Sequence, residues 1–163
     1  VLAGGKGARR GPLSGKPAPT VALPRLAGGP AQSLLADADR GVVLFFWATW
    51  CKACKPNLEW LARRHGHRMA EGAPPGPRIA TVVAEPAEDV LVTFNRLGLT
   101  GADAVPVWLD ADGAAFRAYG VGGLPYTVFI APDGTVVADF IGPLDAAALR
   151  EEFRRLETLL SRP

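Results

Sequence analysis

The chain has 163 residues, of which 48% are hydrophobic and 21% are charged, and its formal net charge at pH 7 is +2. A chain of this size can bury a sizeable core, so it needs neither a disulfide nor a metal to hold one domain together. The small net charge gives no electrostatic reason to expect nucleic acid binding. No apolar run reaches the length of about 18 residues that a membrane-spanning helix requires.

The first residues differ in composition from the rest of the chain. Residues 1–19 are rich in Gly, Pro and Arg without periodicity, which predicts a flexible tail or tether. Residues 20–163 then form a single domain. The start lacks the apolar segment of a signal peptide. It begins with Val1 rather than methionine, which leaves room for a membrane anchor that once preceded it.

Apolar runs and turn signals predict strands and helices that alternate along the chain. Runs rich in β-branched and aromatic residues predict buried strands, and amphipathic stretches that end near Gly predict helices. The expected strands are 20–26, 42–47, 78–84, 105–110 and a hairpin of 125–131 and 135–142 around the turn at 132–134. The expected helices are a turn within 31–41, then 51–70, 86–98, 114–121 and 144–160. This order predicts a three-layer α/β fold.

The two cysteines of the chain, Cys51 and Cys54, lie in the segment WATWCKACK (47–55), which follows the apolar run 41–46. A helix that begins near Cys51 favours a thiolate there, because unpaired backbone N–H groups and the helix dipole stabilise negative charge. Lys52 and Lys55 add positive charge nearby. Cys54 follows one helical turn later, close enough to resolve a mixed disulfide formed by Cys51. The pattern therefore predicts a redox dithiol in which Cys51 attacks and Cys54 resolves.

Two cysteines at this spacing can also serve other purposes. A zinc site needs two more ligands, and His65 and His67 are spaced too closely to share one metal ion. A purely structural disulfide would close a very small loop and stabilise the fold little. The main alternative is a metallochaperone-like module that binds copper through the same dithiol, because soft thiolates suit Cu(I).

The stretch FFWATWCKAC (45–54) strongly resembles the thioredoxin family. It is most similar to the TlpA/ResA-like branch, whose bacterial members face outward from the cytoplasmic membrane. The similarity extends to GKPAPTVALPRL (15–26), to the long segment 105–137 and to the turn GGLPYT (122–127) within it. It covers roughly residues 15–160. This resemblance implies a thioredoxin-like three-layer α/β/α sandwich with a central mixed sheet, an N-terminal extension and a central insert.

The resemblance also implies roles for residues around the dithiol. Pro125 corresponds to the family's cis-proline, which packs against the two cysteines, and the backbone at Leu124 pairs with the client chain. Trp50 is expected to form a flat apolar rim around the reactive thiol. Lys52 and Ala53 are the two spacer residues of the motif.

Three positions depart from the family pattern. Phe45 stands where thioredoxins have a buried acid, Asn57 where the ResA-like branch has a glutamate, and Glu59 where thioredoxins have a proline. Proton transfer by the usual carboxylate is therefore in doubt. Glu59 and Glu85 are candidate substitutes, although a solvated surface charge is the simpler interpretation of each.

By resemblance, the protein is expected to reduce disulfides in a few client proteins outside the cytoplasm. Its clients would be the haem-site cysteines of apo-cytochrome c or the copper-site thiols of an oxidase or its chaperone. A branch that supports maturation of methylamine dehydrogenase shares the Leu-Pro-Tyr turn. Electrons would come from a membrane or periplasmic thiol donor. The expected protein is a periplasmic or otherwise extracytoplasmic monomer, which an N-terminal anchor would tether to the membrane, with no cofactor besides the Cys51–Cys54 disulfide.

Overall fold

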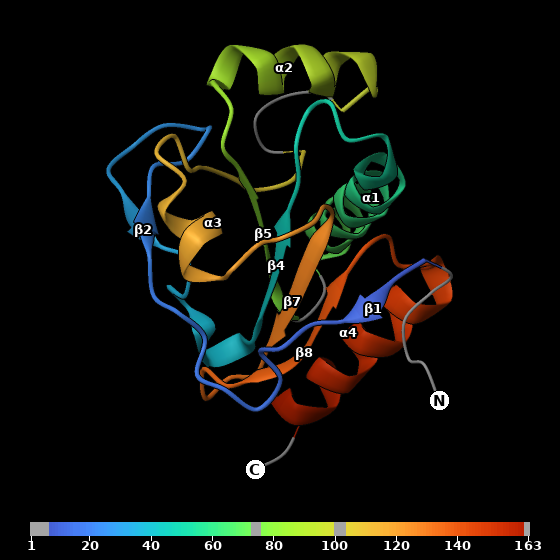
Figure 1. The fold of residues 1–163 in the computed structure, drawn as a ribbon. Helices are drawn as coiled ribbons and strands as arrows, with labels where there is room; N and C mark the ends of the chain where they lie inside the picture. The colour runs from blue at the N-terminus through green and yellow to red at the C-terminus, as the bar shows by residue number, and fades with distance from the viewer. Residues whose placement is uncertain (1–6, 73–75, 100–103, 162–163) are drawn as a thin grey trace.

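The fold is built on one mixed β-sheet, which the computed structural model describes over residues 7–72, 76–99 and 104–161. The sheet has six strands in the order β1-β8-β7-β4-β5-β6 (Figure 1). These strands are β1 Arg9–Arg10, β4 Val42–Phe46, β5 Arg78–Val83, β6 Val107–Leu109, β7 Tyr126–Ile130 and β8 Val136–Ile141. A separate two-stranded ribbon pairs β2 Ala22–Leu23 with β3 Gln32–Ser33.

Helices and the ribbon cover the two faces of the sheet. The helices α1 Lys55–Glu71, α2 Ala87–Arg96 and α4 Ala146–Leu160 share one core with it, and α3 Ala114–Ala118 and the ribbon lie on the other side (Figure 1). Two short 3₁₀ turns, η1 Ala38–Arg40 and η2 Lys52–Cys54, precede β4 and α1. The predicted three-layer α/β/α sandwich with a mixed sheet is confirmed.

Strand β4 lies at the centre of the sheet because both of its faces are apolar. It pairs in parallel with β5 and antiparallel with β7, and all of its residues are buried. Val43 and Phe45 pack in the core beneath α1, α2 and α4. The alternate residues pack in the core beneath α3: Val42, Leu44 and Phe46. A strand without polar residues is stable only when both faces are covered in this way.

The N-terminal segment corrects one sequence prediction. The sequence predicts a flexible tail over residues 1–19, but the described part of it, residues 7–19, lies along the sheet. Strand β1 pairs antiparallel with β8, and the Gly11 N–H donates to the Asp139 carbonyl at 2.9 Å. These bonds use backbone groups alone, so a composition poor in apolar residues does not reveal them. Residues 1–6 lie outside the described residues.

A buried carboxylate also anchors this segment. Asp139 in β8 is 1% exposed, and its Oδ2 atom accepts hydrogen bonds from the Tyr126 hydroxyl at 2.6 Å and the Leu13 N–H at 3.1 Å. Burial, and then the hydrogen bond to Asp139, raises the pKa of the Tyr126 hydroxyl. The hydroxyl therefore remains a donor at neutral pH, and the N-terminal segment folds as part of the domain.

Smaller differences concern element boundaries. The strand predicted over 20–26 shortens to β2, which ends just before Pro24, a residue without an N–H for a ladder. The helical turn predicted within 31–41 is replaced by β3 and η1. The helix predicted from Cys51 begins at Lys55, because the two cysteines belong to the 3₁₀ turn η2 and the residue before it.

We expect Gly11→Ala to destabilise the protein by about 1–3 kcal/mol, the usual cost of overpacking. A Cβ atom at Gly11 would overlap the Asp139 carboxylate, so the segment would have to move away from β8. Thermal unfolding followed by circular dichroism measures the effect.

Gly122→Ala is the matched control, because a Cβ atom there meets no other atom within 4 Å and the φ angle is not positive. If both variants unfold at the same temperature, residues 7–19 do not pack as described.

Candidate active site

The cysteine motif follows the central strand without a flexible connection. After Phe46, the last residue of β4, the Trp47 N–H donates to the carbonyl of Val82 on β5 at 3.1 Å. The Trp47 ring stacks on Phe94 of α2, with ring centroids 6.0 Å apart. The chain is therefore held by β5 and α2 before it reaches Cys51.

The two cysteines differ in their access to the surface. Cys51 and Cys54 form a disulfide, with Cα atoms 5.4 Å apart, and α1 begins directly behind them at Lys55. Cys51 is 6% exposed, whereas Cys54 is fully buried. The N-terminal end of a helix stabilises a thiolate, so the arrangement suits Cys51 as the attacking sulfur and Cys54 as the resolving one.

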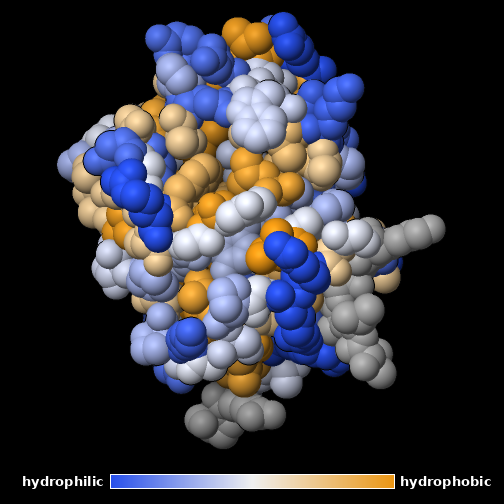
Figure 2. All heavy atoms as spheres, viewed as in Figure 1, coloured by the Kyte–Doolittle hydropathy of each residue, from blue (hydrophilic) through white to orange (hydrophobic). Residues whose placement is uncertain are grey.

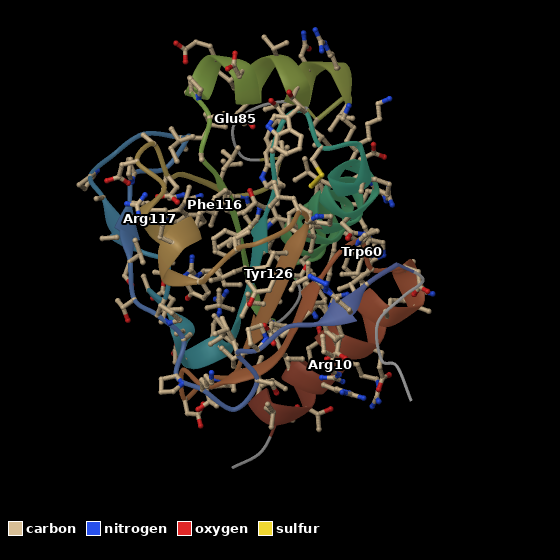
Figure 3. All side chains as sticks on the ribbon, in the orientation of Figure 1. Arg10, Trp60, Glu85, Phe116, Arg117 and Tyr126 are labelled. Carbon is tan, nitrogen blue, oxygen red and sulfur yellow. A yellow bond between two sulfur atoms is a disulfide. The ribbon has the colours of Figure 1, made fainter. Side chains whose placement is uncertain are left out.

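The surface beside Cys51 is apolar, with hydrophilic side chains around it. Trp50 is 73% exposed, and the spacer residues Lys52 and Ala53 are also exposed. Figure 2 shows hydrophobic residues gathered in a hollow between α3 and the ends of α1 and α2, rimmed by hydrophilic side chains, and Phe116 lies beside this hollow in the matching view of Figure 3. An exposed tryptophan at such a place offers a partner a large, rigid contact.

The turn before β7 lies at the same end of the sheet as the dithiol. Tyr126 pairs with Phe46 across β7 and β4, so Pro125 comes level with the residue that follows β4. The Leu124–Pro125 peptide bond is cis, as expected. Pro125 is buried, and Leu124 is partly buried against both halves of the core. The structure therefore places the predicted turn at the end of the sheet where the dithiol lies, and packing of Pro125 against the cysteines stays a prediction.

Glu85 is the candidate acid that the structure brings to the motif. It follows β5, and its two carboxylate oxygens accept hydrogen bonds from the Thr49 N–H at 3.1 and 3.0 Å. Because Thr49 lies two residues before Cys51, these hydrogen bonds hold the carboxylate beside the chain segment that leads into Cys51. Figure 3 shows Glu85 at the α2 end of the sheet, the end where the disulfide lies. Glu59, the other candidate, lies on α1 and is partly exposed.

Asn57 has a structural role that its position in the sequence does not reveal. Its side chain is 3% exposed, its Nδ2 donates to the Leu144 carbonyl at 2.6 Å, and its Oδ1 accepts from the Leu144 N–H at 3.0 Å. Both ends of the amide are therefore used by the connection between β8 and α4. The one hint of this role in the sequence is that Asn57, a polar residue, lies next to Leu58, which belongs to the apolar stripe of the helix. Asn57 bonds to Leu144 and Glu85 bonds to Thr49, and both partners use backbone groups. No feature of the sequence marks Leu144 or Thr49 as a partner.

The position of the family's buried acid is occupied by a hydrophobic side chain. Phe45 is fully buried and belongs to the same core cluster as Cys54. Apolar surroundings disfavour a thiolate, so the reduced form is expected to keep the proton on Cys54 until resolution.

In residues 7–72, 76–99 and 104–161, no group of three or more His, Cys, Asp and Glu side chains is arranged to hold a metal ion. No helix within the same ranges is both long and apolar enough to cross a membrane. The copper alternative therefore has the two sulfurs of Cys51 and Cys54 as its ligands in this part of the chain.

Comparison with known proteins fits this geometry. The model of the AhpC/TSA family matches residues 14–139. The chain belongs to the AhpC/TSA family. Together with the strand-to-helix dithiol and the cis-proline turn, this makes it a thiol–disulfide oxidoreductase of the thioredoxin fold, with a ResA-like sequence.

Relatives support the same class. The thiol-disulfide oxidoreductase ResA of Bacillus subtilis is 30% identical over 112 residues, which are 69% of this chain and 59% of that protein. The thiol:disulfide interchange protein DsbE of Allochromatium vinosum is 32% identical over 149 residues, or 88% and 75% of the two chains. The structure of a DsbE-like interchange protein from Chlorobium tepidum matches with a TM-score of 0.72 and 25% identity, over 91% of this chain and 98% of that one.

We expect Asn57→Ala to lower the free energy of unfolding by about 2–4 kcal/mol, because it leaves the buried N–H and carbonyl of Leu144 without partners. Urea denaturation of the oxidised protein measures the loss. Glu59→Ala, on the same turn of α1 but partly exposed, is the control and should change stability by about 0.5 kcal/mol or less. Equal losses in the two variants would contradict the structural role of Asn57.

Proposed function

We propose that this protein exchanges disulfides with client proteins through Cys51 and Cys54, and that its main direction is reduction of the client. The observation that carries the proposal is the disulfide at the start of α1, in which Cys51 keeps a small exposed fraction and Cys54 is fully buried. The ResA and DsbE relatives support the same class of reaction.

Reduction starts from the dithiol form. The Cys51 thiolate attacks one sulfur of the client disulfide, that S–S bond breaks, and the client's other sulfur leaves as a thiolate that takes up a proton. Cys54 then loses its proton and attacks the Cys51 sulfur, which releases the second client sulfur as a thiol. The client gains two electrons and the protein is left with the Cys51–Cys54 disulfide. A thiol protein of the membrane or periplasm supplies the two electrons that restore the dithiol.

Client binding uses the surface around Cys51. The exposed Trp50 ring and the backbone at Leu124 are the proposed contacts for a client segment that lies across the dithiol. This position suits an extended chain, because an unpaired backbone beside a sheet end binds by strand-like hydrogen bonds. The proposed clients, by resemblance to the TlpA/ResA-like branch, are the haem-site cysteines of apo-cytochrome c or copper-site thiols. The proposed location is periplasmic or otherwise extracytoplasmic.

Glu85 is the proposed proton acceptor during resolution. Phe45 and Asn57 fill the positions where relatives carry acids, and Asn57 is fully hydrogen-bonded to Leu144. Glu85 accepts hydrogen bonds from the Thr49 N–H, two residues before Cys51. A carboxylate therefore lies beside the motif, although it comes from the segment after β5.

We expect Cys54→Ser to accumulate mixed disulfides with clients through Cys51, because no second thiol remains to release them. Cys51→Ser should trap almost none, because Cys54 is fully buried. Non-reducing gel electrophoresis of cell extracts, followed by mass spectrometry of the trapped bands, measures both and identifies the client. Equal trapping by the two variants would contradict this division of labour, and no trapping by either would contradict the proposed function.

We expect Glu85→Gln to slow reduction of insulin or a small model disulfide by about 10²-fold at neutral pH, the usual contribution of a general base. Glutamine keeps an oxygen that accepts from Thr49 but takes up no proton, so the fold and the melting temperature should be retained. Glu88→Gln, an exposed residue of the first turn of α2, is the control and should react at the wild-type rate. A wild-type rate in Glu85→Gln would exclude the residue as the acceptor.

A further inference from the structure

A basic cavity lies at the end of the sheet away from the dithiol. Arg78 is the first residue of β5 and pairs with Val42, the first residue of β4, whereas the cysteine motif follows the last residue of β4. Strand β4 separates the two ends by about 16 Å. The cavity consists of two adjoining hollows of about 210 and 560 Å³ that share four lining residues: His65, Met69, Arg78 and Pro106.

Positive charge in this cavity exceeds the negative charge around it. Five arginines line it: Arg25, Arg40, Arg64, Arg68 and Arg78. Two carboxylates oppose them among the described residues. Asp37 lines the larger hollow, and Glu157 pairs with both Arg64 and Arg68. Arg25, Arg40 and Arg78 form no salt bridge with any described residue, and Asp37 is the carboxylate that acts on Arg78, so positive charge exceeds negative charge within this group.

The same three arginines have unused hydrogen-bond donors. Their Nε atoms are buried, and none of these atoms has a hydrogen-bond partner in the described part of the chain. Leaving a buried donor unpaired costs about 1–3 kcal/mol, and more when the group is charged. These Nε atoms are out of reach of solvent, so an anion in the cavity would bind through the terminal nitrogens of the guanidinium groups and would offset the buried charge that carries this cost.

An aromatic ring holds two of these guanidinium groups in place. The Cζ atoms of Arg25 and Arg78 lie 4.5 and 5.1 Å from the centroid of the Trp108 ring. Trp108 is 2% exposed, and Arg78 also donates to the Leu34 carbonyl. The two side chains therefore lose little further freedom when a ligand binds, which favours affinity.

The guanidinium groups of Arg25, Arg40 and Arg78 stay charged although they repel one another. Burial lowers the pKa of the Arg78 guanidinium, Asp37 raises it, and Arg25 and Arg40 lower it further. Arginine nevertheless stays protonated in proteins. The fold therefore holds several like charges close together, which an anion would stabilise.

We propose that this cavity binds the phosphate group of an anionic ligand, with Arg25, Arg40 and Arg78 as its donors. The planar fork of a guanidinium matches two phosphate oxygens, and clustered arginines provide several such forks. Arg40 and Arg78 line the smaller hollow, and Arg25 and Arg78 line the larger one. A phosphate or diphosphate group placed where the two hollows adjoin would therefore lie among all three arginines. Such a group belongs either to a soluble phosphate compound or to the headgroup of an anionic phospholipid.

Calorimetric titration of the full chain with pyrophosphate tests the site, with sodium chloride at matched ionic strength as the reference. Arg25→Gln and Arg40→Gln should each weaken binding at least about 10-fold, the usual effect of losing a charge-assisted hydrogen bond. Arg150→Gln, exposed on α4 and outside the cavity, removes the same charge and should weaken it less than about 2-fold. If one cavity variant fails to fold, the other provides the same comparison.

Cosedimentation with vesicles distinguishes the two sources of phosphate. Vesicles of phosphatidylglycerol and phosphatidylcholine are compared with vesicles of phosphatidylcholine alone. Binding to pyrophosphate that depends on Arg25 and Arg40 supports a soluble ligand, and binding only to the anionic vesicles with the same dependence supports a headgroup. Failure of the wild-type protein to bind either probe would overturn the proposal. So would equal weakening by Arg150→Gln, because that indicates diffuse attraction to surface charge.

Discussion

The burial of strand β4 is the constraint on which the rest of the structure depends. Its apolar residues need a covering layer on each face and a paired strand on each side, so the chain must supply helices above and below and neighbours in β5 and β7. The cysteine motif begins where this strand ends. The reactive sulfur is therefore positioned by the most deeply buried element of the fold, and not by a surface loop that could move independently.

Around this fixed position, the polar groups differ from those that the resemblance to thioredoxins and ResA-like proteins implies. A phenylalanine fills the place of the buried acid, and an asparagine that replaces a glutamate is used entirely to fasten α1 to the β8–α4 connection. The carboxylate beside the motif comes instead from Glu85, after the neighbouring parallel strand. The ends of adjacent parallel strands meet at one edge of a sheet, which is why a residue after β5 lies beside the segment that follows β4.

The sequence predicted those features that depend on residues close together in the chain. The apolar run before Cys51, the cysteine spacing and the hairpin turn at 132–134 are local patterns, and each one predicted its element. The exceptions depend on distant partners. Asn57 bonds to a residue 87 positions away, and Leu13 bonds to Asp139 across 126 positions. Such contacts involve backbone groups, which every residue carries, so residue type alone does not indicate them.

The Asn57 contact also gives the two sulfur atoms different mechanical supports. Cys54 lies three residues before Asn57 and is therefore tied to the β8–α4 side of the molecule. Cys51 lies two residues after Thr49, which Glu85 ties to the β5–α2 side. The S–S bond is thus a covalent brace between two separately supported parts. The bond therefore links the support that Asn57 gives to Cys54 with the support that Glu85 gives to the segment before Cys51, in addition to the three peptide bonds between the two cysteines.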